Sequence, residues 1–351
     1  MKSSSWHTNT TQIIGHSTGN PDEQTQAIIN AIAKAEQEKT QSNNSESGKQ
    51  KVNNQAFIKA LRENEDPLTP FFPDALDVHS ISDFTFSNRH SNNIAIRLYI
   101  PKSEGPHALV VYFHGGCWVF CSLDTHDGIC TQLCNKANVA VASIDYRLAP
   151  EAKFPAAYQD CIDACNYLYG HAKALDLDSD NISLMGDSAG GNLAAVVSQH
   201  PDTRARICSQ VLLYPITDVS RLDRPSYEQY AENFFFEAKM MHWACEQYAR
   251  NENDRFNANM SPLLLDTFNA LPATLVQTAE FDVLRDEAEE YAARLFEAGA
   301  DVLCKRYAGT VHAFAAMAKV VEQGQKALDD AAQFIKLQSQ ASRALPSEGA
   351  I

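Results

Sequence analysis

The sequence predicts an α/β fold in which a mostly parallel central sheet is flanked by helices. From residue 94 onward, short apolar runs alternate with helical stretches, an order typical of parallel strands joined by helices. Several runs, such as ALVVYF at 108–113, are nearly continuous in β-branched and aromatic residues, which suits strands buried on both faces. With 351 residues, 44% of them hydrophobic, the chain can bury one large core with a smaller appended part.

The N-terminal region is expected to contribute helices before the first strand. In the segment 20–38, Asn20 is the expected N-cap, Pro21 takes the first helical position, and Glu23 follows three residues after the cap. A polar stretch near 39–55 has no apolar periodicity, so we expect a flexible connection there. A second short helix is predicted over 56–64.

The strands are expected in the apolar runs at 94–101, 108–116, 139–148, 182–187, 210–215, 274–282 and 302–309. One aromatic-rich segment, 226–251, interrupts the alternation of strands and helices. It fits either helices that bury an ordinary core stripe or a lid over a hydrophobic substrate pocket, and the residues alone leave both open.

Composition excludes several classes of protein. The formal net charge of −15 and the lack of clustered Lys and Arg argue against nucleic acid or an anionic membrane as a partner. No apolar run is long enough for a secretory signal or a membrane span, so we expect a soluble cytoplasmic protein without stable membrane insertion. Nine cysteines, an odd number without a Cys-x-x-Cys knuckle, indicate reduced thiols and no metal site.

Two pentapeptides place a serine between glycines: GHSTG at 15–19 and GDSAG at 186–190. A nucleophile elbow requires a strand before the serine, small residues around it and a helix directly after it. The run NISLMGDSAGGNLAAVV supplies all three around Ser188, whereas Ser17 sits in a turn before a helix that is expected to begin later. We therefore predict Ser188 as the nucleophile and Ser17 as part of a polar surface turn.

A serine hydroxyl needs a base and an acid that orients the base. Asp282 follows the strand at 274–282, and His312 follows the next strand, which gives the order serine, acid, histidine. The rival acids are less suitable, because Glu280 is still in the strand and Asp286 and Glu287 fall in the first turn of a helix. The rival histidines are badly placed along the chain; they are His171, His200 and His242.

The run YFHGGCW at 112–118 supplies a fourth component. A strand that ends in His-Gly-Gly lets backbone N–H groups approach an oxyanion closely, because glycine has no Cβ in the way. The helix that starts at Ala189 adds a further N–H near the nucleophile.

Over about residues 80–330 the chain resembles the hormone-sensitive lipase family of the α/β-hydrolase superfamily, which includes many bacterial carboxylesterases. The motifs that carry the resemblance are HGGCW, DYRLAPE, FPAAYQD, GDSAGGNLA, LLYP, EFDVLRDE and GTVHAF. The resemblance implies the triad Ser188, Asp282 and His312. It also implies an oxyanion hole at Gly115, Gly116, Cys117 and Ala189, in which Cys117 replaces a third glycine.

The resemblance also implies an α/β-hydrolase fold with a helical cap. We expect an N-terminal cap segment at 1–80, a catalytic core at 81–215 and 259–340, a cap insertion at 216–258 and a C-terminal tail at 341–351. Within DYRLAPE, we expect Asp145, Arg147 and Glu151 to form a buried polar network. The predicted substrate pocket comprises Trp118, Tyr227, Phe234, Phe235, Phe236 and Met240.

The expected activity is hydrolysis of short- to medium-chain carboxylic esters through an acyl-enzyme, with a small-molecule ester as partner and no cofactor or metal. An amidase or arylformamidase uses the same triad and is the alternative. A non-catalytic ligand-binding protein on the same scaffold is less favoured, because all three triad residues are present. The sequence leaves open whether the chain forms a homodimer.

Overall fold

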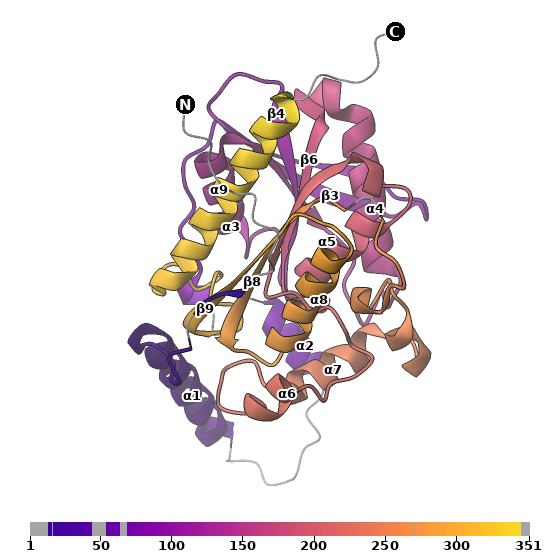
Figure 1. Ribbon diagram of the computed structural model, residues 1–351. Helices are drawn as coiled ribbons and strands as arrows, with labels where there is room; N and C mark the ends of the chain where they lie inside the picture. The colour runs from indigo at the N-terminus through magenta and orange to yellow at the C-terminus, as the bar shows by residue number, and fades with distance from the viewer. Residues whose placement is uncertain (1–12, 16, 44–53, 64–68, 270, 345–351) are drawn as a thin grey trace.

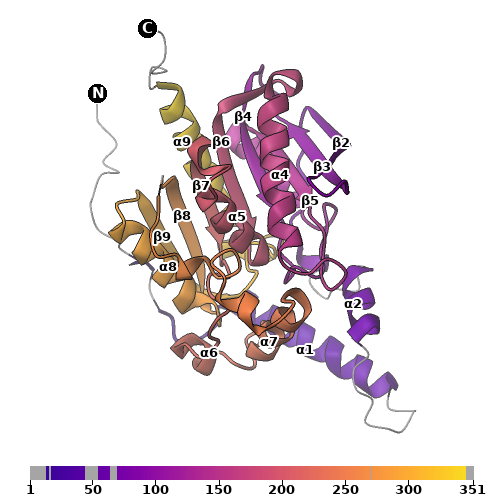
Figure 2. The same ribbon diagram turned by 90° about the vertical axis from the view of Figure 1, so that its right-hand side faces the viewer.

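A single mixed sheet runs through the protein, and helices cover both of its faces (Figures 1 and 2). The computed structural model describes residues 13–15, 17–43, 54–63, 69–269 and 271–344. In this part of the chain the sheet has nine strands in the order β1-β9-β8-β7-β6-β4-β5-β3-β2. In this spatial order, neighbouring strands from β1 as far as β5 pair in parallel. The last two pairs, β5 with β3 and β3 with β2, are antiparallel.

All seven predicted strands are present, and two further strands lie at the edges of the sheet. The bounds of the strands are β1 (Ile13–Ile14), β2 (Ser80–Ser87), β3 (Asn93–Ile100), β4 (His107–Phe113), β5 (Ala140–Asp145), β6 (Leu177–Asp187), β7 (Ile207–Leu213), β8 (Ala273–Phe281) and β9 (Val302–Val311). The additional strands β1 and β2 lack apolar runs because they sit at the edges, where most of the β2 side chains are exposed.

Each face of the sheet has its own apolar core. One core joins the sheet to α4 (Ala156–His171), α5 (Ala189–Gln199) and α8 (Arg285–Glu297). The other joins it to α3 (Asp127–Leu133) and α9 (Glu322–Ala344). The central strands are therefore buried on both sides, which explains their continuous apolar sequences. Among the described residues, none of the helices is both long and apolar enough to cross a membrane.

The remaining helices lie near the carboxyl ends of the parallel strands (Figure 2). They are α1 (Glu23–Asn43), α2 (Asn54–Arg62), α6 (Pro225–Gln229) and α7 (Ala238–Tyr248). The helices at the N-terminus and in the insertion thus lie over the carboxyl ends of the strands, where parallel α/β proteins bind ligands. The division of the chain at 81, 216 and 259 stays a prediction. Strand β1 joins the N-terminal segment to the sheet itself.

The start of α1 differs from the prediction. The helix begins at Glu23, and the side chain of Asp22, not of Asn20, accepts a hydrogen bond from the Thr25 N–H at 2.7 Å. Asp22 is thus the N-cap. The helix also continues to Asn43, into the stretch predicted to be flexible; the part of that stretch at 44–53 lies outside the described residues.

The DYRLAPE residues do not form the network that we expected. Asp145 is exposed, Arg147 pairs with the fully buried Asp160 at 2.8 Å, and Glu151 pairs with Arg62 at the end of α2. Arg62 also donates to the carbonyl groups of Val119 and Ala149, at 2.8 and 2.7 Å. The motif therefore anchors two separate elements, α4 and the cap helix α2.

The pairing of Arg147 with Asp160 gives a prediction of stability. Arg147→Met removes the cation but leaves the carboxyl group of Asp160 buried without its ion-pair partner, with Asn88 as a neutral hydrogen-bond partner at 2.6 Å. We expect a loss of about 3 kcal/mol in the free energy of unfolding, measured by chemical denaturation. The control Asp145→Asn alters an exposed carboxylate and should stay within about 0.5 kcal/mol of the wild type. Equal losses in the two variants would contradict this account.

Candidate active site

Ser188 lies at a sharp turn between β6 and α5. Its backbone angles, φ 55° and ψ −117°, are strained for an L-residue, and the turn is held by the Ser188 N–H, which donates to the Leu213 carbonyl at 2.8 Å. Small neighbours are necessary here, because a Cβ on Gly190 would lie 1.9 Å from the Phe113 carbonyl oxygen. The local geometry is that of the predicted nucleophile elbow.

The three predicted triad residues come together at the carboxyl edge of the sheet. His312, which follows β9, lies with Nε2 2.9 Å from the Ser188 Oγ and with Nδ1 2.8 Å from the Asp282 Oδ2. The other oxygen of Asp282 accepts the Leu284 N–H at 3.0 Å. All three side chains are at most 5% exposed. In this arrangement the imidazole can take the Ser188 proton while the carboxylate stabilises the charge that results.

The rival residues have other partners. Glu280 accepts a hydrogen bond from the Ser17 hydroxyl at 2.6 Å, so the serine of the GHSTG pentapeptide binds one of the rival acids. Asp286 accepts the Ser226 N–H at 2.9 Å. His171 stacks on Tyr167 with 4.1 Å between ring centroids, and His200 lies 3.7 Å from the Asp202 carboxylate. None of these contacts forms a second pairing of serine, histidine and acid.

The loop predicted to bind the oxyanion, residues 114–120, follows β4, and hydrogen bonds fix the directions of its peptide groups. The Gly115 carbonyl accepts the His114 Nδ1–H at 2.8 Å, and the Gly116 carbonyl accepts the N–H groups of Val119 and Phe120 at 2.8 and 3.0 Å. In a trans peptide the N–H points opposite to the C=O, so the N–H groups of Gly116 and Cys117 point away from these partners. Such fixed donors are what an oxyanion hole requires.

The prediction that Gly115 is an oxyanion donor is wrong. The Gly115 N–H donates to the Asp187 Oδ1 at 2.9 Å, so it already has a buried partner and does not belong with the oxyanion donors. Cys117 has φ 55°, a left-handed conformation that favours glycine, which explains why a third glycine would suit this position. The predicted donors that remain are Gly116, Cys117 and Ala189.

Asp187 is a buried support of the oxyanion loop that the sequence reasoning missed. Its carboxylate also accepts the Tyr112 hydroxyl at 2.7 Å and lies 3.2 Å from the His126 Nε2. Burial alone would raise the pKa of Asp187, but His126 and Tyr112 outweigh burial and hold that pKa below its ordinary value. The position of Asp187 directly before the nucleophile could have indicated this role, because a charged residue at a buried position requires hydrogen-bonding or charged partners.

The predicted pocket residues lie in different surroundings. Phe236 stacks on the His312 ring with 4.3 Å between centroids, and Phe234 stacks on Phe281, next to Asp282, at 5.3 Å. Trp118 is fully buried against Tyr248 at 4.5 Å. Phe235 and Met240 pack against the core at its margin. Of the six residues, Phe236 therefore has the most direct contact with the triad.

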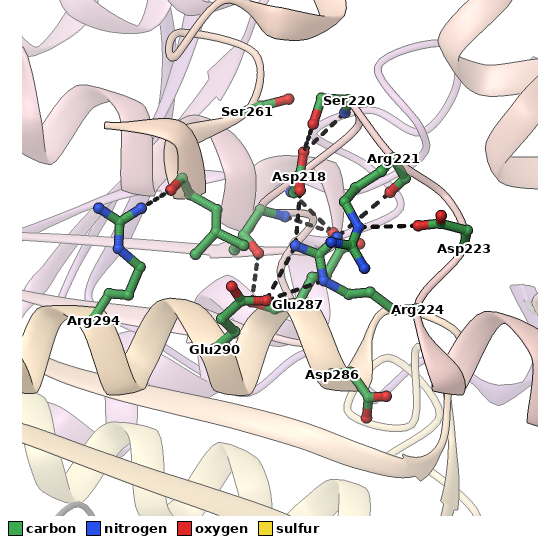
Figure 3. Close-up of polar contacts among 12 residues, drawn as sticks. Asp218, Ser220, Arg221, Asp223, Arg224, Ser261, Asp286, Glu287, Glu290 and Arg294 are labelled. Carbon is green, nitrogen blue, oxygen red and sulfur yellow. Dashed lines mark hydrogen bonds and ion pairs between the residues drawn. The ribbon is translucent and has the colours of Figure 1, made fainter. Parts of the chain in front are cut away.

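Tyr227, the remaining pocket candidate, contacts a polar cluster around the buried Glu287. Figure 3 shows other members of this cluster, Asp218, Arg224 and Glu290, beside Glu287. The Tyr227 hydroxyl donates to Glu287 at 3.3 Å, and Glu287 also accepts the N–H groups of Thr217 and Asp218, at 2.8 and 3.2 Å. Arg224 bridges Asp218 and Glu290 beside this carboxyl group, at 2.8 and 3.2 Å. The cluster ties α6 and the segment after β7 to α8, which begins three residues after Asp282.

All nine cysteines lie within the described ranges and are thiols, not disulfides. Burial raises the pKa of Cys134, Cys165, Cys245 and Cys304 to about 12. At neutral pH these side chains are uncharged packing groups.

Comparison with known proteins agrees with this architecture. Residues 110–316 match a family described as having the alpha/beta hydrolase fold. An ethyl acetate hydrolase from Pseudomonas putida is 35% identical over 254 residues, which cover 71% of this chain and 80% of the relative. Among solved structures, a hyperthermophilic esterase from Pyrobaculum calidifontis is 32% identical with a TM-score of 0.80, and the match covers 92% of this chain and 99% of that one.

A third relative was solved with a ligand. It is an ester hydrolase from the metagenome of Lake Arreo, complexed with a derivative of bipyridine phosphonate, and is 33% identical with a TM-score of 0.81 over 90% of this chain and 98% of that one. The chain belongs to the α/β-hydrolase fold family. Within that family it is a carboxylic ester hydrolase of the hormone-sensitive-lipase-like branch.

The Glu287 cluster gives a prediction of pH dependence. Burial raises the pKa of Glu287 to about 8, well above the 4.5 that is ordinary for a glutamate. Between these two values the folded protein binds a proton that the unfolded chain lacks, so this group lowers the stability as the pH rises towards 8. Glu287→Gln removes the titration. The difference in the free energy of unfolding, variant minus wild type, should therefore increase by at least about 1 kcal/mol between pH 5 and 8. Above pH 8 this difference should become constant.

The matched control for this prediction is Glu290→Gln, on the same helix, whose side chain is 53% exposed. Its difference from the wild type should stay nearly constant over the same pH range. A flat difference for Glu287→Gln would show that Glu287 titrates normally in the folded protein.

Proposed function

We propose that the protein hydrolyses carboxylic esters through an acyl-enzyme on Ser188. His312 takes the proton of the Ser188 hydroxyl as the oxygen attacks the ester carbonyl, and it then protonates the departing alcohol. Water, activated by the same imidazole, cleaves the acyl-enzyme. The observation that carries the proposal is the continuous hydrogen-bonded line from Ser188 Oγ through His312 to Asp282, with distances of 2.9 and 2.8 Å.

The N–H groups of Gly116, Cys117 and Ala189 stabilise the oxyanion in this proposal. Two features support the assignment: the fixed peptide directions of the 114–120 loop, and the position of Ala189 at the start of α5, where the helix dipole favours negative charge. The phosphonate derivative in the Lake Arreo relative belongs to a compound class that resembles the tetrahedral intermediate, so a phosphonate ester is a suitable probe of Ser188 here.

An amidase or arylformamidase would use the same residues, and substrate comparison separates the two activities. The esterase assignment expects a nitrophenyl ester to be hydrolysed with a much higher kcat/KM than an N-formyl arylamine. The reverse order would favour the formamidase. The named activities of the relatives, an ethyl acetate hydrolase and an esterase, support the ester.

The first functional prediction concerns the nucleophile. Ser188→Ala should lower kcat for a soluble ester by about 10⁴- to 10⁶-fold, because it removes the hydroxyl that lies 2.9 Å from the His312 Nε2. Ser17→Ala changes the serine of the other pentapeptide and should cost less than about tenfold. Covalent labelling by a phosphonate ester should disappear in the first variant alone. A Ser188→Ala enzyme that still turned over would overturn the assignment.

The second functional prediction concerns chain length. We propose a preference for short- to medium-chain acyl groups, because Phe236 stacks on His312 and is only 8% exposed, which limits the space beside the triad. In a series of nitrophenyl esters, kcat/KM should fall for long chains. Phe236→Ala should move the optimum to longer chains, whereas the control Phe256→Ala, at a side chain that is 61% exposed, should not. A wild-type optimum on long-chain emulsions would refute this preference.

A further inference from the structure

The N-terminal pentapeptide GHSTG, which chemistry at Ser188 leaves without a role, binds a buried carboxylate close to the triad. The Ser17 hydroxyl and the Thr18 N–H donate to the Glu280 Oε1 at 2.6 and 3.0 Å, and the Gly19 N–H lies 3.4 Å from the same oxygen. The Thr18 hydroxyl lies 2.9 Å from Oε2 and 2.6 Å from the Asn20 carbonyl, so its proton is shared.

The glycines of the pentapeptide have structural reasons too. A Cβ on Gly15 would lie 2.5 Å from the Arg306 carbonyl oxygen on β9, and Gly19 has φ +75°. Gly15 therefore lies close against β9, and the chain turns at Gly19, directly after the two residues that bind Glu280. The match to a nucleophile pattern reflects a turn that binds an anion through neutral donors.

Glu280 also contacts the strand that leads to His312. Register between β8 and β9 shifts between Ala279, opposite Tyr307, and Phe281, opposite Val311, so β9 has two extra residues at this point. Within the irregularity the Gly309 N–H donates to the Glu280 Oε2 at 2.8 Å, and the Gly309 carbonyl accepts the Asp22 N–H at 2.9 Å. Gly309 has φ +77°, which glycine alone adopts readily.

One carboxylate thus joins three segments within a few residues of the catalytic groups. Glu280 is two residues before Asp282, Gly309 is three residues before His312, and the third segment is the N-terminal turn. Apolar packing strengthens the junction, because Ile28 and Ile32 of α1 pack in one cluster with Phe281 and Val311, the residues adjacent to Asp282 and His312.

The donors to Glu280 are sufficient to keep it charged. Among the described residues it makes no ion pair, and its side-chain hydrogen bonds come from neutral groups. Burial alone would raise the pKa of Glu280, but the hydrogen bonds from Ser17, Gly309 and Thr18 outweigh burial and hold the pKa below its ordinary value. Hydrogen bonds to an ionised acceptor are stronger than neutral ones, so the junction is stiff at neutral pH.

We propose that Glu280, held by Ser17 and Thr18, is a positioning residue that fixes the loops of Asp282 and His312 relative to each other. It does not touch substrate; it acts through the Asp282–His312 hydrogen bond. This inference rests on the proposed function, since it assigns the pair to the triad. According to this proposal, the N-terminal segment affects the reaction rate through the position of the Asp282–His312 pair.

The test uses the full-length chain and substitutions that keep the size of the side chain. In Glu280→Gln, the side chain loses its negative charge. Its amide nitrogen, itself a donor, would also face one of the donors that now bind a Glu280 oxygen. Misplacement of about 1 Å can cost 10²-fold in rate, so we expect kcat to fall by about tenfold or more while KM stays within about twofold. The low-field proton resonance of the His312 Nδ1–H should shift or broaden.

A second variant, the double substitution Ser17→Ala with Thr18→Val, removes both hydroxyl donors from a surface segment and leaves the sheet intact. It should lower kcat by at least about threefold and change the same resonance, whereas Ser17→Thr with Thr18→Ser keeps both hydroxyls and should restore kcat. If Glu280→Gln fails to fold, this pair of variants decides the question.

Glu289→Gln is the matched control. Glu289 is another buried carboxylate that joins β8 to β9, through Thr278 at 3.0 Å and Arg306 at 2.8 Å, but it lies farther from the catalytic ends of the strands. It should change stability without changing the resonance or kcat by more than about twofold.

Unchanged kcat and an unchanged resonance in folded Glu280→Gln or in the double Ser17, Thr18 variant would overturn the proposal, as would an equal effect of Glu289→Gln. Failure of the proposed function would look different. In that case the wild type would not hydrolyse esters, or Ser188→Ala would remain active, while the resonance would still report whether Glu280 positions the Asp282–His312 pair.

Discussion

The His312 ring has to lie between two oxygen atoms that belong to different loops, and most of the structure around the site serves this requirement. Ser188 Oγ and Asp282 Oδ2 are each within 2.9 Å of the imidazole, yet they follow strands β6 and β8, which are separated by β7. A parallel sheet brings the ends of these strands to one edge. The sheet does not by itself fix the loops beyond that edge to the accuracy that proton transfer needs.

Buried carboxyl groups supply the missing constraint in three places. Asp187 accepts the Gly115 N–H beneath the oxyanion loop, and Glu287 accepts the Thr217 and Asp218 N–H groups beneath the cap insertion. Glu280 accepts N–H groups from the N-terminal turn and from Gly309. In each case an acceptor on regular structure holds backbone donors of an irregular segment, which otherwise have no ladder partner. These carboxyl groups are buried because their hydrogen-bonding partners belong to loops packed over the sheet.

The sequence predicted the features that depend on local pattern. Seven strands, the elbow at Ser188 and the order of Ser188, Asp282 and His312 follow from apolar periodicity, small residues and chain order. Pairing between distant residues could not be predicted in this way. These contacts depend on which surfaces meet after folding. They are the ion pairs Arg147–Asp160 and Arg62–Glu151, the hydrogen bond from the Gly115 N–H to Asp187, and the hydrogen bond from Ser17 to Glu280. The edge strands β1 and β2 were missed because exposed strands lack the apolar runs that mark buried ones.

Strand β1 has a consequence for self-association. The outer edge of β9 carries backbone donors and acceptors that another strand could bind, and such edges are common sites of unwanted pairing between chains. Ile13 and Ile14 occupy this edge opposite Cys304 and Lys305. A second molecule could pair with β9 at these positions only by displacing the first molecule's own N-terminal strand. Pairing of another chain with β9 here and docking of β1 are therefore mutually exclusive states of the same strand edge.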